Sequence, residues 1–153
     1  MPHITENLVI EEALPYFYLH GHCHLYEGAS TENWRDATPT NIIQTDQPWY
    51  VLYHFTTDGL LNHLMAGTWH LQLFLEKMGG EEFTLNPAYA IDQINFVSRP
   101  HEYYRWAIIP AGQVPPGVYR AVASVTFKGP LGVPGPIAAF ADIGLVQFYE
   151  EGP

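Results

Sequence analysis

The sequence predicts an all-β fold, a single antiparallel β-sandwich of about seven to eight short strands, the usual number for such sandwiches. Apolar and polar residues alternate along several segments, which is the period of a strand with one buried face. The 13 glycines and 13 prolines fall mainly between these segments, as residues of turns do. No window sustains the 3.6-residue period of an amphipathic helix, so we expect no helix longer than about three turns. A length of 153 residues corresponds to one domain.

The chain divides into an N-terminal arm, residues 1–14, and the sandwich domain, residues 15–153. The pattern of the arm fits a helical turn and an extended segment equally well. The first strand expected is Tyr16–Tyr26, followed by a polar loop with a short strand at residues 41–44. Trp49–Thr57 carries apolar residues on both faces, which predicts a strand buried on both sides.

The second half of the chain supplies the remaining strands. Thr68–Lys77 alternates cleanly, with Trp69 on the apolar face, and ends before Gly79-Gly80. Two weaker strand candidates are residues 82–85 and 91–97. The last strands expected are Tyr103–Ile109, Gly117–Phe127 and Ile137–Tyr149, with a kink at Gly144 in the last of them.

The segment Ile109–Ala121 carries the residues of one resemblance. Gly117-Val118-Tyr119 follows a Pro- and Gly-rich loop and opens a late strand. This arrangement resembles immunoglobulin-like and fibronectin type III-like domains, in which such a tyrosine hydroxyl bonds to upstream backbone, the tyrosine corner. The resemblance implies that Tyr119 is the corner residue and that Trp69 is the core tryptophan. It implies the superfold without its disulfide, because Ala121 stands where antibody domains have a cysteine, and it says nothing about function.

Charge and cysteine content exclude several classes of partner. Six Lys and Arg against sixteen Asp and Glu give a net charge of −10, which repels phosphate backbones and anionic lipid headgroups. We therefore expect neither nucleic-acid binding nor membrane insertion. The single cysteine, Cys23, and the lack of a signal-peptide pattern predict a cytoplasmic location, with signal-independent export left open.

Histidines on the first strand form the one candidate metal site. His20, His22 and His24 alternate along the strand, so their side chains share one face at spacings of about 7 Å. A ligand from a neighbouring strand would complete a transition-metal site. His20-x-His22 with Glu27 also resembles half of the cupin metal motif, in which two histidines and a glutamate bind a metal inside a jelly roll. Leu14 stands at the position of the motif's upstream glycine, and the second half of the motif is absent.

The leading hypothesis is a non-enzymatic structural or interaction protein that self-assembles or docks on a protein partner. No catalytic motif occurs, so we expect no enzyme, no catalytic residue and no cofactor. Charged residues make up 14% of the chain and aromatic residues another 14%, which leaves apolar side chains outside the core. We expect a homo-oligomer whose interface includes Tyr50, Leu52, Phe74, Val118 and Val122. The alternatives are a metal-binding or cupin-like metal-dependent enzyme using the histidine face, and a small-ligand or carbohydrate-binding module with Trp and Tyr as stacking platforms.

Overall fold

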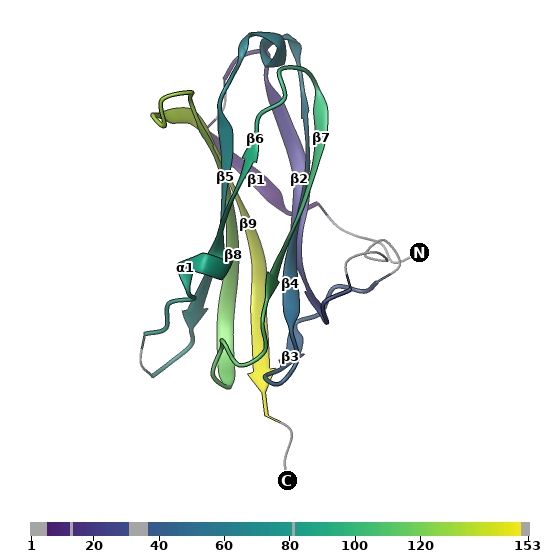
Figure 1. Ribbon diagram of the computed structural model, residues 1–153, viewed down its shortest axis with the longest axis vertical. Coiled ribbons are helices and arrows are strands. Elements are labelled where there is room, and N and C mark those ends of the chain that lie inside the picture. Colours follow the sequence, from purple (N-terminus) through teal and green to yellow (C-terminus); the bar gives the residue numbers. More distant parts are fainter. Residues whose placement is uncertain (1–5, 13, 31–36, 81, 151–153) are drawn as a thin grey trace.

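Strands form nearly all of the regular structure in the computed structural model, which describes residues 6–12, 14–30, 37–80 and 82–150 (Figure 1). The strands in this part of the chain are β1 Leu8–Glu12, β2 Tyr18–Glu27, β3 Ile42–Gln44, β4 Trp49–Asp58, β5 Thr68–Lys77, β6 Ile91–Asn95, β7 His101–Ile109, β8 Gly117–Lys128 and β9 Pro134–Tyr149. The described helices are a 3₁₀ turn, η1 (Leu60–Leu64), and one α-helical turn, α1 (Pro87–Ala90). Neither described helix has the length and apolar character that crossing a membrane requires.

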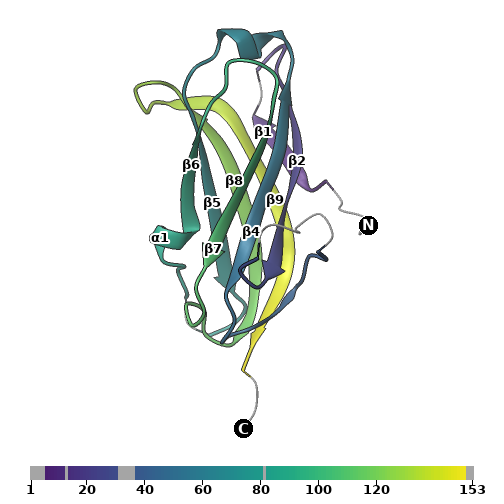
Figure 2. The ribbon, with the colours of Figure 1, turned by 45° about the vertical axis from the view of Figure 1, so that its right-hand side comes forward.

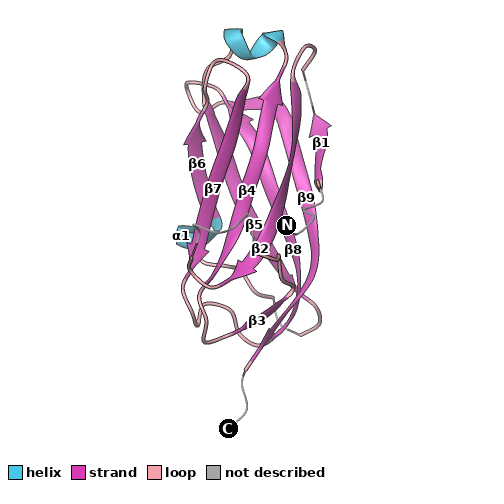
Figure 3. Ribbon diagram, turned by 90° about the vertical axis from the view of Figure 1, so that its right-hand side faces the viewer, coloured by secondary structure: helices cyan, strands magenta, loops and turns pink. Residues whose placement is uncertain are grey.

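Two sheets pack face to face. The larger sheet has the order β1-β9-β8-β5-β6, and β3 pairs in parallel with the C-terminal end of β9. The smaller sheet has the order β2-β4-β7 and lies in front of the larger one in Figure 3. Apart from β3, all pairings between the described strands are antiparallel. The fold is therefore an all-β sandwich, consistent with the general immunoglobulin-like class.

Trp69 on β5 lies at the centre of the core between the sheets. Its side chain is fully buried, and it packs among aromatic rings of both layers, with centroid distances between 5.3 and 6.2 Å. These rings belong to Phe17, Phe55, Phe96, Tyr103 and Phe127. Cys23 is also buried on the core face of β2, and burial raises the pKa of its thiol. The core thus forms from the alternate residues that the strand pattern predicts.

The predicted strands are confirmed with small changes at their ends. Residues 42–44 form the short β3, and the weak candidate 91–97 contains β6. β4 is the central strand of the smaller sheet and is buried on both faces, as expected. The strand expected at 82–85 is wrong, because these residues have no regular secondary structure.

The sequence left two local features undecided: the conformation of the N-terminal arm and the form of the kink at Gly144. The described part of the N-terminal arm contains an extended strand, and β1 pairs with β9 through Leu8 to Glu12. The kink at Gly144 is a β-bulge, since Ala121 pairs with Gly144 and Val122 with Asp142. Gly144 has a φ of 102°, which glycine adopts without strain. The bulge shifts the alternation of β9 by one residue.

Candidate interaction surface

The outer face of the larger sheet is the surface that faces away from the smaller sheet. On β8, Tyr119, Ala121 and Ala123 are fully buried, so the residues that alternate with them project outward. These outward residues include Val118 and Val122, two of the predicted interface residues. The sequence pattern therefore assigned the two faces of β8 correctly.

Phe74 on β5 is brought to the same face. It lies opposite Val122 in the pairing of β5 with β8, so the two side chains are cross-strand neighbours. Phe74 is 46% exposed and Val118 is 38% exposed, while Val122 is partly buried. Three of the five predicted interface residues thus lie on one surface.

Three further apolar residues on this face were missed by sequence reasoning. Val9, Phe140 and Leu145 are 60%, 37% and 56% exposed. Val9 pairs with Phe140 across β1 and β9, and Leu145 lies beyond the bulge. The bulge hides Leu145 from a simple alternation rule, because Phe140 and Leu145 share a face despite their odd spacing.

The charged residues at the centre of the outer face include one ion pair. Arg120 donates hydrogen bonds to both carboxylate oxygens of Asp142. This bond raises the pKa of Arg120 and lowers the pKa of Asp142, and both side chains are exposed. Glu76 lies opposite Arg120 on β5. The ion pair interrupts the apolar surface without giving it a large net charge.

Tyr50 and Leu52, the other two residues predicted at the interface, are buried within the chain. Both lie on the outer side of the smaller sheet, but they are only 1% and 0% exposed. With Tyr26 they form a second apolar cluster, against which Ala37, Tyr104 and Trp106 pack. The rings of Tyr26 and Tyr50 are stacked at 5.1 Å. The chain covers these side chains itself, so they are not available to a partner.

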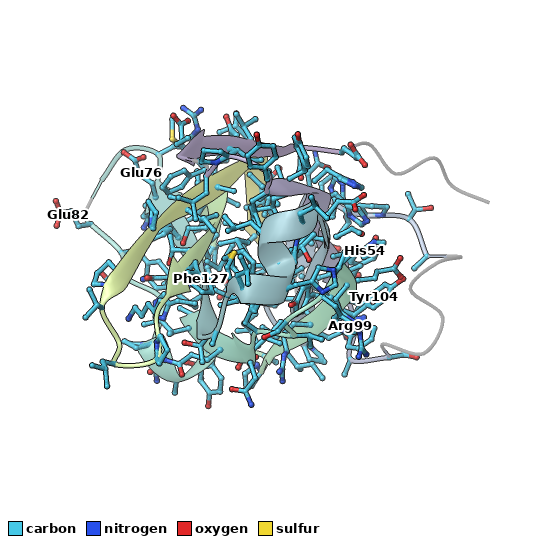
Figure 4. All side chains as sticks on the ribbon, turned by 90° about the horizontal axis from the view of Figure 1, so that it is seen from above. His54, Glu76, Glu82, Arg99, Tyr104 and Phe127 are labelled. Carbon is cyan, nitrogen blue, oxygen red and sulfur yellow. The ribbon has the colours of Figure 1, made fainter. Side chains whose placement is uncertain are left out.

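The histidine face continues this covered side of the smaller sheet. His22 and His54 share a hydrogen bond of 2.8 Å between Nε2 and Nδ1. His54 stacks on Tyr104 at 4.2 Å, and its Nε2 lies 3.7 Å from Oε1 of Glu102. Figure 4 shows His54 and Tyr104 side by side, across the molecule from Glu76. The ring of His24 lies 5.1 Å from that of His22.

The predicted metal ligands do not converge. His20 is exposed and lies 3.5 Å from Glu6, whereas Glu27 accepts a hydrogen bond from the backbone N–H of Gln44. Burial, reinforced by His24 and His54, lowers the pKa of His22 to about 4. Among the residues that the structure describes, no three His, Cys, Asp or Glu side chains are grouped to hold a metal ion.

Tyrosine and tryptophan positions complete the comparison with the predicted sites. The hydroxyl of Tyr119 donates to the carbonyl oxygen of Pro115 at 2.7 Å, the upstream backbone bond that the resemblance implies. Trp49 and Trp69 are buried in the core, and Trp106 is partly buried. Trp34 lies outside the described residues.

No protein-family model matches the chain, and no curated protein matches it.

Proposed function

We propose that this chain is a non-enzymatic interaction domain, a β-sandwich that self-associates through the outer face of its larger sheet. The observation that carries the proposal is the exposure of apolar side chains from three adjacent strands of that face. The Phe74–Val122 pair, Phe140 and Leu145 are its principal members.

The composition of the outer face suits an interface. Interface centres are enriched in aromatic residues and depleted of charged ones. Monomeric proteins rarely expose large contiguous apolar patches, and where such a patch is exposed it usually marks an interaction site. The charges at the centre of the face, Arg120 and Asp142, already form a pair. A partner that covers the face therefore meets one neutralised ion pair, with the single negative charge of Glu76 beside it.

A second copy of the chain fits this surface as a face-to-face partner. Sheets pack about 10 Å apart when their side chains interdigitate, and most homo-oligomers are two-fold symmetric. In that arrangement the face pairs with itself. Burial of the exposed phenylalanine rings would then contribute most of the association free energy.

The strand order supports placing the fold within the immunoglobulin-like superfold. In that superfold, strands B and E share one sheet and strands C, F and G share the other. Here β4 and β7 are neighbours in the smaller sheet, and β5, β8 and β9 follow one another in the larger sheet. Trp69 then lies on the strand equivalent to C, and Tyr119 opens the strand equivalent to F. Such an assignment describes the scaffold and does not specify an activity.

The test of self-association is the particle mass in solution. We expect light scattering across a dilution series to give a mass above the 17.3 kDa of one chain, falling towards that value on dilution. The double substitution Phe74→Lys and Phe140→Lys should give a monomer. Leu131→Lys is the matched control, because Leu131 is 92% exposed in the turn between β8 and β9 and lies outside the outer face. A monomeric wild-type mass up to about 100 µM would contradict the proposal.

The alternative is a metal-dependent enzyme, and elemental analysis distinguishes it from the non-enzymatic interaction domain. We expect protein purified without a tag or added metal to carry far less than one transition-metal ion per chain. Stoichiometric metal that is lost in the double variant His20→Ala and His22→Ala would favour the alternative.

A further inference from the structure

One end of the sandwich exposes four large apolar side chains. The turn before β2, η1 and the turn between β6 and β7 form this end, which lies opposite the C-terminus in Figures 2 and 3. Tyr16 and Tyr18 are 70% and 60% exposed, and Leu60 and Leu64 are 75% and 83% exposed. We call these four residues the apolar end. They lie on other segments than the outer face of the larger sheet and share no residue with it.

Backbone contacts hold the two tyrosines beside η1. The N–H of Leu61 donates to the carbonyl oxygen of Tyr16 at 3.1 Å, and Tyr18 pairs with Asp58 across β2 and β4. The backbone also approaches closely at Gly59, where a Cβ would collide with the carbonyl oxygen of Tyr16. The four side chains of the apolar end therefore belong to one continuous piece of structure.

η1 is anchored from within, and its two exposed leucines point away from the anchor. Asn62 is fully buried, and its side-chain amide donates to the carbonyl oxygens of the two residues before η1 at 2.6 and 2.9 Å. Leu61 packs against the core. Leu60 and Leu64 flank these anchors and remain exposed. A contact made by the two leucines thus needs little ordering of the turn, which lowers the entropic cost of binding.

Tyr16 adopts a backbone conformation that is costly for a tyrosine. Its φ is 59°, and it is the one non-glycine residue with a positive φ in the part of the chain that the structure describes. Glycine occupies this region without strain, and a bulky side chain does not. Here the conformation directs an aromatic ring to solvent and not to the core. Strain of this kind is concentrated at functional sites, so it marks the apolar end as a contact surface.

Charge is distributed unevenly between the two ends of the sandwich. In the segments that form the end with η1, residues 14–18, 58–67 and 96–101, Asp58 is the one acidic residue and Arg99 the one basic residue. The opposite end carries Lys77 and several acidic residues. These acidic residues are Glu27, Asp46, Glu82 and Glu150. The net charge of −10 therefore lies mainly away from the apolar end, which is close to neutral.

We propose that the apolar end docks on the surface of a lipid bilayer with neutral, zwitterionic headgroups. Leucine side chains partition into the boundary between headgroups and acyl chains, and tyrosine rings place an apolar body and a polar hydroxyl at headgroup level. Leu60 and Leu64 enter that boundary, with Tyr16 and Tyr18 beside them. The contact is peripheral, because η1 has five residues and a spanning helix needs about 20.

Shape and charge favour a bilayer over a protein as the occupant. The leucines stand on a turn that protrudes at the end of the long axis, so a protein partner would need an apolar recess of matching shape. The headgroup region of a bilayer adapts to a protruding turn. The net charge of −10 led us to expect no membrane insertion, and it does oppose anionic lipids. A neutral lipid surface that meets a neutral end lacks this repulsion.

Vesicle flotation tests the proposal. The probe is vesicles of phosphatidylcholine alone at about 5 mM lipid, and we expect at least about a quarter of the wild-type protein to float with them. Leu60→Asp combined with Leu64→Asp should lower the bound fraction at least about fivefold, because both leucines leave the contact. The matched control is Ile42→Asp combined with Met78→Asp, which makes the same charge change at exposed apolar residues of the opposite end. Circular dichroism checks that both variants are folded.

Three results would overturn the proposal. The first is wild-type protein that does not float, or an equal loss of binding in the two double variants. The second is stronger binding when part of the phosphatidylcholine is replaced by phosphatidylserine, since attachment would then be driven by charge. The third is a lower particle mass of the Leu60→Asp and Leu64→Asp variant without lipid, which would make this end a contact between copies. Phe74→Lys combined with Phe140→Lys should still float, so failure of self-association leaves this test intact.

Discussion

Tyr119 joins the loop after β7 to the start of β8. Its buried ring packs against Phe148 at 5.5 Å, and its hydroxyl donates to the carbonyl oxygen of Pro115. Tyr119→Phe should lower the free energy of unfolding by about 1 to 3 kcal/mol, because the ring stays and one hydrogen bond is lost. Urea denaturation measures this change. Tyr18→Phe, at an exposed tyrosine, is the control, and an equal effect of both substitutions would contradict the role of the bond.

His22 should make stability depend on pH. Its pKa is lowered from 6.5 to about 4, first by burial and then by His24 and His54. Between these values the unfolded chain binds a proton that the folded protein does not, so the free energy of unfolding decreases as the pH falls through this window. The group contributes no further loss below its folded pKa. We expect His22 to account for a loss of about 3 kcal/mol between pH 7 and pH 4.

The measurement compares urea denaturation of the wild type and His22→Gln across that pH range. The difference between the two proteins should shrink as the pH falls, since only the wild type loses this contribution. His63→Gln, at an exposed histidine of η1, is the control. Parallel pH profiles for the wild type and His22→Gln would refute the assignment.

At the scale of elements, β2 and β4 approach closely at Gly21. A Cβ at this position would lie 2.6 Å from the Cα of Phe55 and would also contact the carbonyl oxygen of His54. Backbone atoms of a central strand cannot move aside, so Gly21→Ala should destabilise the fold by about 2 kcal/mol or more. Gly129→Ala is the matched control, because its Cβ would have its nearest contact at 3.7 Å. Thermal unfolding of both variants checks the prediction, and equal melting temperatures would contradict it.

The edges of the two sheets differ in which groups cover them. On β2, the Asn7 side chain donates to the carbonyl oxygen of Cys23 and accepts from its N–H, both at 2.8 Å. This side chain replaces a neighbouring strand at that point and blunts the edge. Beside Leu73–Lys77 of β5 no described strand pairs, yet Leu73 and Leu75 are almost fully buried, so this edge is covered by packing.

At the scale of the whole molecule, net charge opposes self-association. Two copies that each carry a charge of −10 repel one another, while the proposed contact is mainly apolar. Salt screens the repulsion, so raising the concentration from about 20 mM to about 500 mM NaCl should strengthen self-association. Sedimentation velocity measures the shift. Dissociation at high salt would indicate an interface held by charge pairs, contrary to the proposed apolar face.

The sequence by itself determined most of the strands and their core faces, although not β1 or the irregular segment 82–85. Alternation is a local property, and it gave the inward position of Trp69 and the outward position of Phe74 without knowledge of the fold, while the resemblance in sequence pointed to Tyr119. The apolar residues on both faces of Trp49–Thr57 likewise predicted a central strand, and β4 is one. These features depend on which way a side chain points along a single strand, and that follows from neighbours in the chain.

Only the tertiary structure decided which residues cover each face and each edge of the two sheets. Tyr50 and Leu52 point outward as the pattern indicates, yet Ala37, Tyr104 and Trp106 cover them. Glu27 bonds to the backbone of Gln44, and Leu73–Lys77 ends the sheet because β6 is short. These outcomes depend on pairings between residues far apart in the chain and on how loops fold over a sheet. Local periodicity carries no information about such contacts, because the same alternating strand forms whether its outer face is covered or open.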